Sequence, residues 1–237
     1  MFRSLYNINI KQFTFRYFSV KLLNMKTKAL NKERQAYFQD IYQKGSAALD
    51  WNFGAAGHKL IELVIDNTIK RGSKILDIGS GPGNEAIFLA KQGMEVTGLD
   101  LNSEAIKLSK KLANLQEVTV KFVQGDAVKL PFKNSSFDVV NDTFVFHHFE
   151  KTIRKIYAQE VNRVLKKDGI FILRGFSCKM TSGSGPFRLT GNEILEAFMP
   201  YFEVENLSLF RNIPTAKRPD QWHWLGIFRK ATKKSEI

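Results

Sequence analysis

The chain has 237 residues, of which 43% are hydrophobic and 25% are charged, a composition typical of globular proteins that excludes a disordered or low-complexity chain. Its single cysteine, Cys178, excludes an internal disulfide and a zinc site built from cysteines. No apolar run reaches the roughly 18 residues that a membrane-spanning helix needs, so we expect no membrane span.

The formal charge of +13 is concentrated near the N-terminus, where residues 1–32 hold seven Lys and Arg and no acidic residue. This concentration weakens the case for a nucleic-acid-binding protein. The basic segment, rich in Phe and Tyr, is typical either of a mitochondrial transit peptide or of an extended start upstream of an initiator at Met25. We expect residues 1–32 to be a targeting or disordered extension, and residues 33–237 to be a single domain. The expected location is cytoplasmic, or mitochondrial if the extension is a transit peptide.

Beyond the extension, apolar residues recur at regular spacings that predict alternating helices and strands. Helices are predicted over Glu33–Gln43, His58–Lys70, Ser103–Asn114 with Ser103 as the N-cap, and Thr152–Lys167. Strands are predicted over Lys74–Gly79, Glu95–Asp100, Val118–Gly125, Phe137–Asn141, Gly169–Phe176, Val204–Phe210 and Trp222–Arg229. The pattern indicates a doubly wound α/β fold, with a mostly parallel, Rossmann-like seven-stranded sheet and an antiparallel C-terminal hairpin at one edge.

In such a sheet, ligands bind at the carboxyl ends of the strands, and the first strand is followed by Asp77-Ile78-Gly79-Ser80-Gly81-Pro82-Gly83. Alternate glycines let the backbone turn sharply and let a ligand lie against it. The next strand ends in Asp100, where a carboxylate can accept hydrogen bonds from both hydroxyls of a ribose. These residues predict a cofactor that contains a nucleoside.

The glycine spacing is G-x-G-x-G rather than the G-x-G-x-x-G of dinucleotide-binding turns, which disfavours a nicotinamide-dependent oxidoreductase. Asp77 precedes the glycines, where a carboxylate would repel a pyrophosphate and attract a cationic amino-acid group. The turn therefore indicates a cofactor with a positively charged part.

These residues resemble the class I S-adenosylmethionine-dependent methyltransferases, and the resemblance extends from about Trp51 to Lys230. The family's motifs are matched in order by LDIGSGPG, VTGLD, GDA, FDVVND followed by FHHF, and EVNRVLKKDGIFIL. The chain is similar to compact small-molecule methyltransferases, among which the tellurite-resistance and thiopurine-like types are candidates.

The resemblance implies S-adenosylmethionine as the cofactor, held by residues of the first four strand ends. They are Asp77 and Gly79 near the methionine part, Ser80, Gly81 and Gly83 in the same turn, Asp100 and Leu101 at the ribose, Asp126 and Ala127 at the adenine, and Asn141 near the active centre. The glycines and Asp77 could alternatively serve only turn formation, and Asp126 could only cap a turn.

The implied reaction is in-line transfer of a methyl group to a small molecule; an RNA methyltransferase or a non-catalytic cofactor-binding module is the alternative. Nucleic acid is not favoured, because Asn141-Asp142-Thr143-Phe144 lacks the N/D-P-P-Y-like turn of enzymes that methylate bases. His147, His148 and Asp142 are candidate bases, although both histidines could instead be packing residues. Trp51 and His147 are candidates for the substrate pocket, and packing is the alternative for Trp51. No metal site and no particular oligomeric state is predicted.

Overall fold

The structure, a computed structural model, describes residues 36, 38–43, 52, 54–180, 186–212, 214 and 220–231. The predicted extension over residues 1–32 and Trp51 lie outside the described residues, and so does part of the predicted helix Glu33–Gln43, of which residues 36 and 38–43 are helical. Among the helices of the described residues, none is long and apolar enough to cross a membrane.

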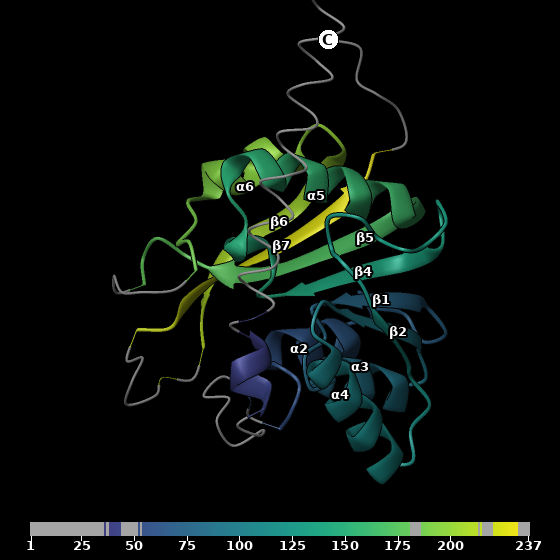
Figure 1. The fold of residues 1–237 in the computed structure, drawn as a ribbon. Coiled ribbons are helices and arrows are strands. Elements are labelled where there is room, and N and C mark those ends of the chain that lie inside the picture. The colour runs from purple at the N-terminus through teal and green to yellow at the C-terminus, as the bar shows by residue number, and fades with distance from the viewer. Residues whose placement is uncertain are drawn as a thin grey trace, which may run out of the picture.

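Seven strands form one sheet in the order β3-β2-β1-β4-β5-β7-β6 (Figure 1). They are β1 (Lys74–Ile78), β2 (Glu95–Asp100), β3 (Lys121–Gln124), β4 (Phe137–Thr143), β5 (Leu165–Phe176), β6 (Phe202–Arg211) and β7 (Trp222–Lys230). Strands β1 to β5 are parallel, and β7 runs antiparallel to both of its neighbours, β5 and β6. The predicted fold class, including the antiparallel strands at the C-terminal edge, is confirmed.

The helices cover both faces of the sheet, as Figure 1 shows. They are α2 (His58–Ile65), α3 (Asn84–Lys91), α4 (Ser103–Leu115), α5 (Lys151–Val164) and α6 (Gly191–Phe198), with a short 3-10 turn, η2, at Phe146–His148. Tyr157 and Phe198 of α5 and α6 belong to the same buried cluster as Phe171 of β5. Leu60 and Leu89 of α2 and α3 belong to the cluster on the other face. The sheet is thus buried on both sides, which explains the short apolar runs in the sequence.

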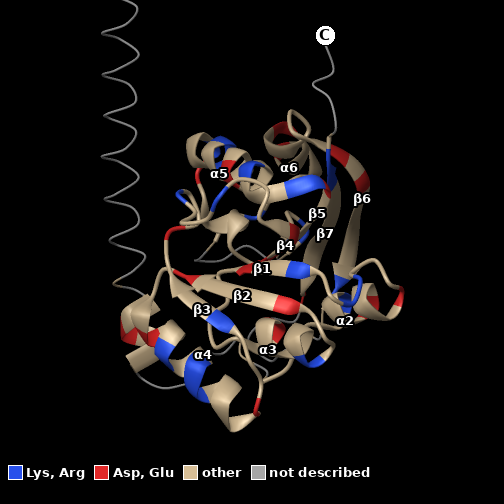
Figure 2. Ribbon diagram, turned by 90° about the vertical axis from the view of Figure 1, so that its right-hand side faces the viewer, with Lys and Arg blue, Asp and Glu red and all other residues tan. Residues whose placement is uncertain are grey.

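Charged residues occur on the helices, on the strands and in the loops. Figure 2 shows Lys and Arg interspersed with Asp and Glu on α4 and on α5, which lie on opposite faces of the sheet. Neither helix presents a purely basic surface.

The structure differs from the predictions at the end of α2 and at the N-cap of α4. Helix α2 ends at Ile65 rather than Lys70, because Asn67 adopts a left-handed conformation (φ 63°) that a helix cannot continue through. The N-cap of α4 is Asn102 rather than Ser103: the Asn102 side chain accepts the backbone N–H groups of Glu104 and Ala105 at 2.8 and 3.3 Å.

Helix α5 ends at Val164, three residues before the predicted end, and the chain continues directly into β5. Lys230 of β7 donates to the carbonyl oxygens of Asn162 and Leu165 at 2.7 and 2.6 Å, which satisfies acceptors that the helix leaves open. Strand β5 therefore begins at Leu165, before the predicted start at Gly169. Helix α6 was not predicted.

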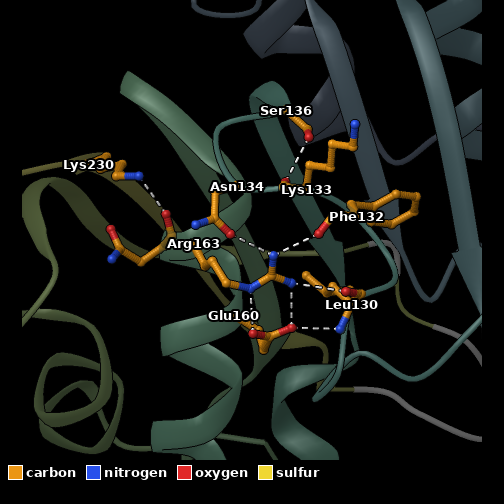
Figure 3. Close-up of polar contacts among 9 residues, drawn as sticks. Leu130, Phe132, Lys133, Asn134, Ser136, Glu160, Arg163 and Lys230 are labelled. Atoms are coloured by element: carbon orange, nitrogen blue, oxygen red, sulfur yellow. Dashed lines mark hydrogen bonds and ion pairs between the residues drawn. The ribbon is translucent and has the colours of Figure 1, made fainter.

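Arg163 of α5 holds the segment between β3 and β4 in place (Figure 3). Its guanidinium donates to the carbonyl oxygens of Phe132 and Leu130 at 2.7 and 2.9 Å, and to Glu160 at 2.7 Å. Glu160 also accepts the backbone N–H of Leu130 at 2.7 Å. The segment fixed in this way begins with the GDA turn at the carboxyl end of β3.

Candidate functional site

The turn between β1 and α3 is bound to the end of β2. The N–H groups of Gly79 and Ser80 both donate to the carbonyl oxygen of Leu99, at 2.7 and 3.0 Å. Gly79 has a φ of 67°, and a Cβ there would lie 2.1 Å from Val145 Cγ2, in the turn after β4. A side chain at this position would be strained and would displace that turn, so the glycine is a structural requirement of the site.

Asp100, at the carboxyl end of β2, fastens the glycine turn from the other side. One carboxylate oxygen accepts the N–H of Gly81 at 2.9 Å, and the other accepts the N–H of Asn102 at 2.8 Å. Burial raises the pKa of Asp100, and these backbone N–H groups partly oppose the rise. Each oxygen has a second lone pair, so the carboxylate can still accept hydroxyl groups. Leu101, next to it, is half-buried.

Tyr42, in helical residues 38–43, lies against the same turn. Its hydroxyl oxygen would be 2.9 Å from a Cβ placed on Gly81. Burial raises the pKa of Tyr42, and the charge of Asp100 adds to the rise. Another residue of this helix, Phe38, packs its ring 5.6 Å from that of His148 after β4. The helix therefore spans from the glycine turn to the end of β4, a contact that the sequence did not indicate.

Asp77 and Asn141 face each other on β1 and β4, in register and fully buried. Asn141 Nδ2 donates to Asp77 Oδ1 at 2.7 Å and to Thr143 Oγ1 at 3.2 Å. Asp77 Oδ2 and Asn141 Oδ1 have no hydrogen-bond partner among the described residues. Buried acceptors of this kind are costly unless a donor reaches them, so the pair indicates a ligand group with N–H donors.

Burial raises the pKa of Asp77 to about 8, and the nearby Glu85 carboxylate contributes to the rise. The hydrogen bond from Asn141 and the charge of Arg174 act in the opposite direction. A cation bound beside Asp77 would favour its ionised form.

Two charged residues at this place were not predicted. Arg174 of β5 is 2% exposed, and its Nη2 lies 3.5 Å from Glu85 Oε1 in the first turn of α3. Nη2 also donates to Thr143 Oγ1. The sequence signal was a single charged residue inside the apolar strand IFILRGF, where a buried charge needs a partner.

The GDA turn contains Asp126, which caps the turn as one of our two interpretations expected. Asp126 Oδ1 accepts the N–H of Val128 at 3.0 Å, and the Asp126 carbonyl oxygen accepts the N–H of Lys129 at 3.0 Å. Ala127 is partly buried against the core.

Asp142 and the two histidines have structural contacts in the turn after β4. Asp142 is fully buried and accepts the N–H groups of Val145 and Phe146 at 2.8 and 3.0 Å and the Tyr157 hydroxyl at 2.6 Å. Burial raises its pKa to about 6. These three hydrogen bonds favour a role for Asp142 in shaping the turn rather than in acid–base chemistry.

His147 is 1% exposed, and its Nδ1 accepts the N–H of Phe176 at 3.0 Å, so the geometry favours the packing interpretation. His148 is half-buried with its ring 4.7 Å from that of His147. The structure thus brings Asp77, Asn141 and the glycine turn with Asp100 together at one edge of the sheet, and separates the candidate bases into packed positions beside it.

This edge fits a cofactor made of a nucleoside and a cationic amino acid. The glycine turn is joined to Asp100 through the N–H of Gly81, and Asp77 Oδ2 and Asn141 Oδ1 are buried acceptors without a partner among the described residues. Within the described part of the chain, no three His, Cys, Asp or Glu side chains gather in a way that could hold a metal ion.

Residues 76–173 match the family model described as a methyltransferase domain. An uncharacterized methyltransferase of Bacillus subtilis, YcgJ, is 39% identical over 101 residues, which are 42% of this chain and 39% of that protein. Demethylmenaquinone methyltransferase of Staphylococcus aureus is 35% identical over 111 residues, 45% of this chain and 44% of that protein. The chain thus spans less than half the length of these two relatives.

The fold is similar to that of Burkholderia thailandensis 1,6-didemethyltoxoflavin-N1-methyltransferase, solved with 1,6-didemethyltoxoflavin and S-adenosylhomocysteine. The TM-score is 0.68 at 21% sequence identity, covering 87% of this chain and 90% of that one.

Proposed function

Since residues 76–173 form a class I S-adenosylmethionine-dependent methyltransferase domain, we propose that the chain transfers a methyl group from S-adenosylmethionine to a small-molecule acceptor. The observation that carries the proposal is the carboxyl edge of β1, β2 and β4. There, a glycine turn bound by Asp100 lies beside two buried acceptors, Asp77 Oδ2 and Asn141 Oδ1, without a partner in the described residues.

We assign the cofactor's parts to this chain's residues as follows. Asp77 and Asn141 would accept the amino group of the methionine part, and the turn with Gly79, Ser80, Gly81 and Gly83 would lie under its chain. Asp100, with Leu101 beside it, would accept the ribose hydroxyls, and Asp126 and Ala127 would hold the adenine. The hydrogen bonds that already fix Asp100 and Asp126 support these assignments, because a preformed site costs little entropy when the ligand binds.

The cofactor, when bound, supplies a methyl group that its sulfonium makes electrophilic. The protein then has to hold an acceptor in line with that methyl group and to exclude water. The hydrogen bonds that Asp142 accepts from the turn and from Tyr157, and the hydrogen bond at the buried Nδ1 of His147, disfavour both as general bases. With these two candidates disfavoured, we propose an acceptor that is nucleophilic without a protein base, such as a phenolate, a carboxylate or a thiolate; the half-buried His148 is the remaining candidate base.

A small-molecule acceptor is supported by the demethylmenaquinone methyltransferase relative. An RNA acceptor would instead be expected to require a continuous basic surface.

The proposal is tested by calorimetric titration of the full chain with S-adenosylmethionine, S-adenosylhomocysteine and NAD. Saturable binding of the first two without binding of NAD is expected, and the saturated protein is then screened against small nucleophiles for methylated products. Binding of NAD alone would refute the proposal. Cofactor binding without turnover of any acceptor, or turnover only of RNA, would favour one of the alternative functions.

A further inference from the structure

Arg174 carries its charge at a buried position, which costs folding free energy. It stands in the middle of the sheet, on β5, and its side chain is 3% exposed. Nη2 contacts Thr143 and Glu85, but Nε has no hydrogen-bond partner among the described residues. Burying a guanidinium is costly unless an opposite charge and hydrogen-bond acceptors compensate it. One donor of Arg174, Nε, has no acceptor among the described residues.

Arg174 lies on the same face of the sheet as the buried acceptors of the proposed methionine site. Asp77 is in register with Asn141, and Thr143 is in register with Arg174, two residues further along β4. Since alternate residues of a strand share a face, Asp77, Asn141, Thr143 and Arg174 form one diagonal row across β1, β4 and β5. The row carries open acceptors at one end and an open donor at the other. This order matches an α-amino acid, whose ammonium group and carboxylate are adjacent.

The backbone before α2 closes over the guanidinium. A Cβ on Gly57 would lie 2.4 Å from Arg174 Nη1, so only glycine leaves space for the arginine. The N–H of Gly57 donates to Glu85 Oε1 at 3.4 Å, the same carboxylate oxygen that pairs with Arg174. Gly57 and Glu85 thereby confine the guanidinium beside Asp77.

We propose that Arg174 binds the α-carboxylate of the cofactor's amino-acid part, while Asp77 and Asn141 bind its amino group. The inference rests on the proposed function and adds a binding residue to it. A guanidinium suits this role, because its planar donors match the two oxygens of a carboxylate. The pairing with Glu85 keeps Arg174 in place before the carboxylate arrives.

The test compares two ligands, of which only one has the amino-acid part that carries the α-carboxylate. S-adenosylhomocysteine carries the amino acid, whereas 5′-methylthioadenosine shares its adenosine and thioether and lacks the amino-acid part. In titration calorimetry, Arg174→Gln is expected to weaken S-adenosylhomocysteine about tenfold to a hundredfold, the effect of losing a hydrogen bond to a charged group. The affinity for 5′-methylthioadenosine should stay within about twofold. Equal losses for both ligands, or no loss for either, would overturn the proposal.

Arg154→Gln is the matched control. Arg154 is also buried, at 4% exposure, and is also paired with a glutamate, Glu193, but it belongs to α5. Its replacement should leave the ratio of the two affinities unchanged. A change in the ratio equal to that of Arg174→Gln would mean that loss of any buried arginine acts on the site, and would overturn the proposal.

A second measurement needs no variant at position 174 and covers the case in which Arg174→Gln does not fold. The unchanged protein is titrated with S-adenosylmethionine and with its decarboxylated analogue, and the analogue should bind at least about tenfold more weakly. Gly57→Ala, whose φ of −65° suits alanine, should reduce this preference by displacing Nη1. Equal affinity for both ligands in the unchanged protein would overturn the proposal. If the unchanged protein binds neither S-adenosylhomocysteine nor 5′-methylthioadenosine, the proposed function itself fails.

Discussion

Replacing Asp77 by Asn is expected to remove a pH dependence from the binding of S-adenosylhomocysteine. The pKa of Asp77 is raised to about 8 by burial and by the charge of Glu85, against the hydrogen bond from Asn141 and the charge of Arg174, while Asp142 adds a smaller rise. Near pH 7, therefore, about a tenth of the free protein carries the ionised carboxylate. Only this form attracts the ligand's ammonium group, so the apparent affinity is reduced by the ionised fraction.

The size of the effect follows from that fraction. With a pKa of about 8, the fraction rises from about 3% near pH 6.5 to about 75% near pH 8.5, so the apparent Kd should fall about twentyfold over this range. In Asp77→Asn the Kd should be the same at both ends. Titration calorimetry in buffers of different ionisation enthalpy provides a second reading, because the unchanged protein should release close to one proton on binding near pH 7.

Asp138→Asn is the matched control for this experiment. Asp138 is also a β4 aspartate but lies near the amino end of the strand, where it accepts from Lys166 and from the N–H of Lys74. Its replacement should leave the twentyfold change in Kd intact. The reasoning is refuted if the unchanged protein binds equally well at both pH values, or if Asp77→Asn keeps the dependence.

The same pKa predicts the sign of a change in stability. An acid whose pKa is raised in the folded state stabilises the fold most when it is protonated, below its unfolded pKa, and this contribution is lost as the pH rises through about 8. Asp77→Asn cannot ionise, so without cofactor it should unfold at a higher temperature than the unchanged protein near pH 8.5. The difference should shrink on acidification, and thermal unfolding followed by circular dichroism measures it.

Three further substitutions test other parts of the structure. Asp100→Ala should weaken S-adenosylhomocysteine by about 1–3 kcal/mol in the same titration, through lost ribose hydrogen bonds, and an unchanged affinity would contradict the ribose assignment. Tyr157→Phe removes a 2.6 Å hydrogen bond to the buried Asp142 and should lower the free energy of unfolding in urea by about 1.5–3 kcal/mol near pH 8. The loss should be smaller near pH 5, where Asp142, with a pKa of about 6, is protonated. The control is Tyr201→Phe, which removes the hydroxyl of a half-buried tyrosine; an equal loss there would argue against a specific role for the Tyr157–Asp142 pair. Arg163→Ala should lower the free energy of unfolding in urea by about 2–4 kcal/mol, because it leaves the carbonyl groups of Leu130 and Phe132 without their donor. A decrease below about 0.5 kcal/mol would show that the segment before β4 does not depend on Arg163 for its conformation.

The strands could be predicted because local composition decides them. A parallel strand covered on both faces is apolar over most of its buried part, and the short apolar runs around Ile75, Val96 and Phe171 show this without reference to the rest of the chain. The glycine turn and Asp100 were predictable for a related reason: backbone conformation and the end of a strand are local properties, and the hydrogen bond from Gly81 N to Asp100 joins the two in the structure.

Other features depend on contacts between distant segments. The carbonyl groups at the early end of α5 accept hydrogen bonds from Lys230, which belongs to the last strand in the chain. No local sequence pattern predicts this partner. The binding role that we propose for Arg174 depends on β1 and β4, which place Asp77 and Thr143 on the same face of the sheet as Arg174. Helix α6 differs from these features, because its capping box, Thr190 with Glu193, is a local signal in the sequence.

The place of β7 in the sheet also has consequences for synthesis of the protein. It inserts between β5 and β6, although both precede it in the chain. Until β7 has left the ribosome, β5 is an open edge whose backbone groups can pair with another chain, and β6 has no strand to join. The last two strands must then dock together, a long-range step that is expected to be slow. A nascent chain of this protein therefore passes through a stage in which a chaperone that shields exposed strands would protect it from aggregation.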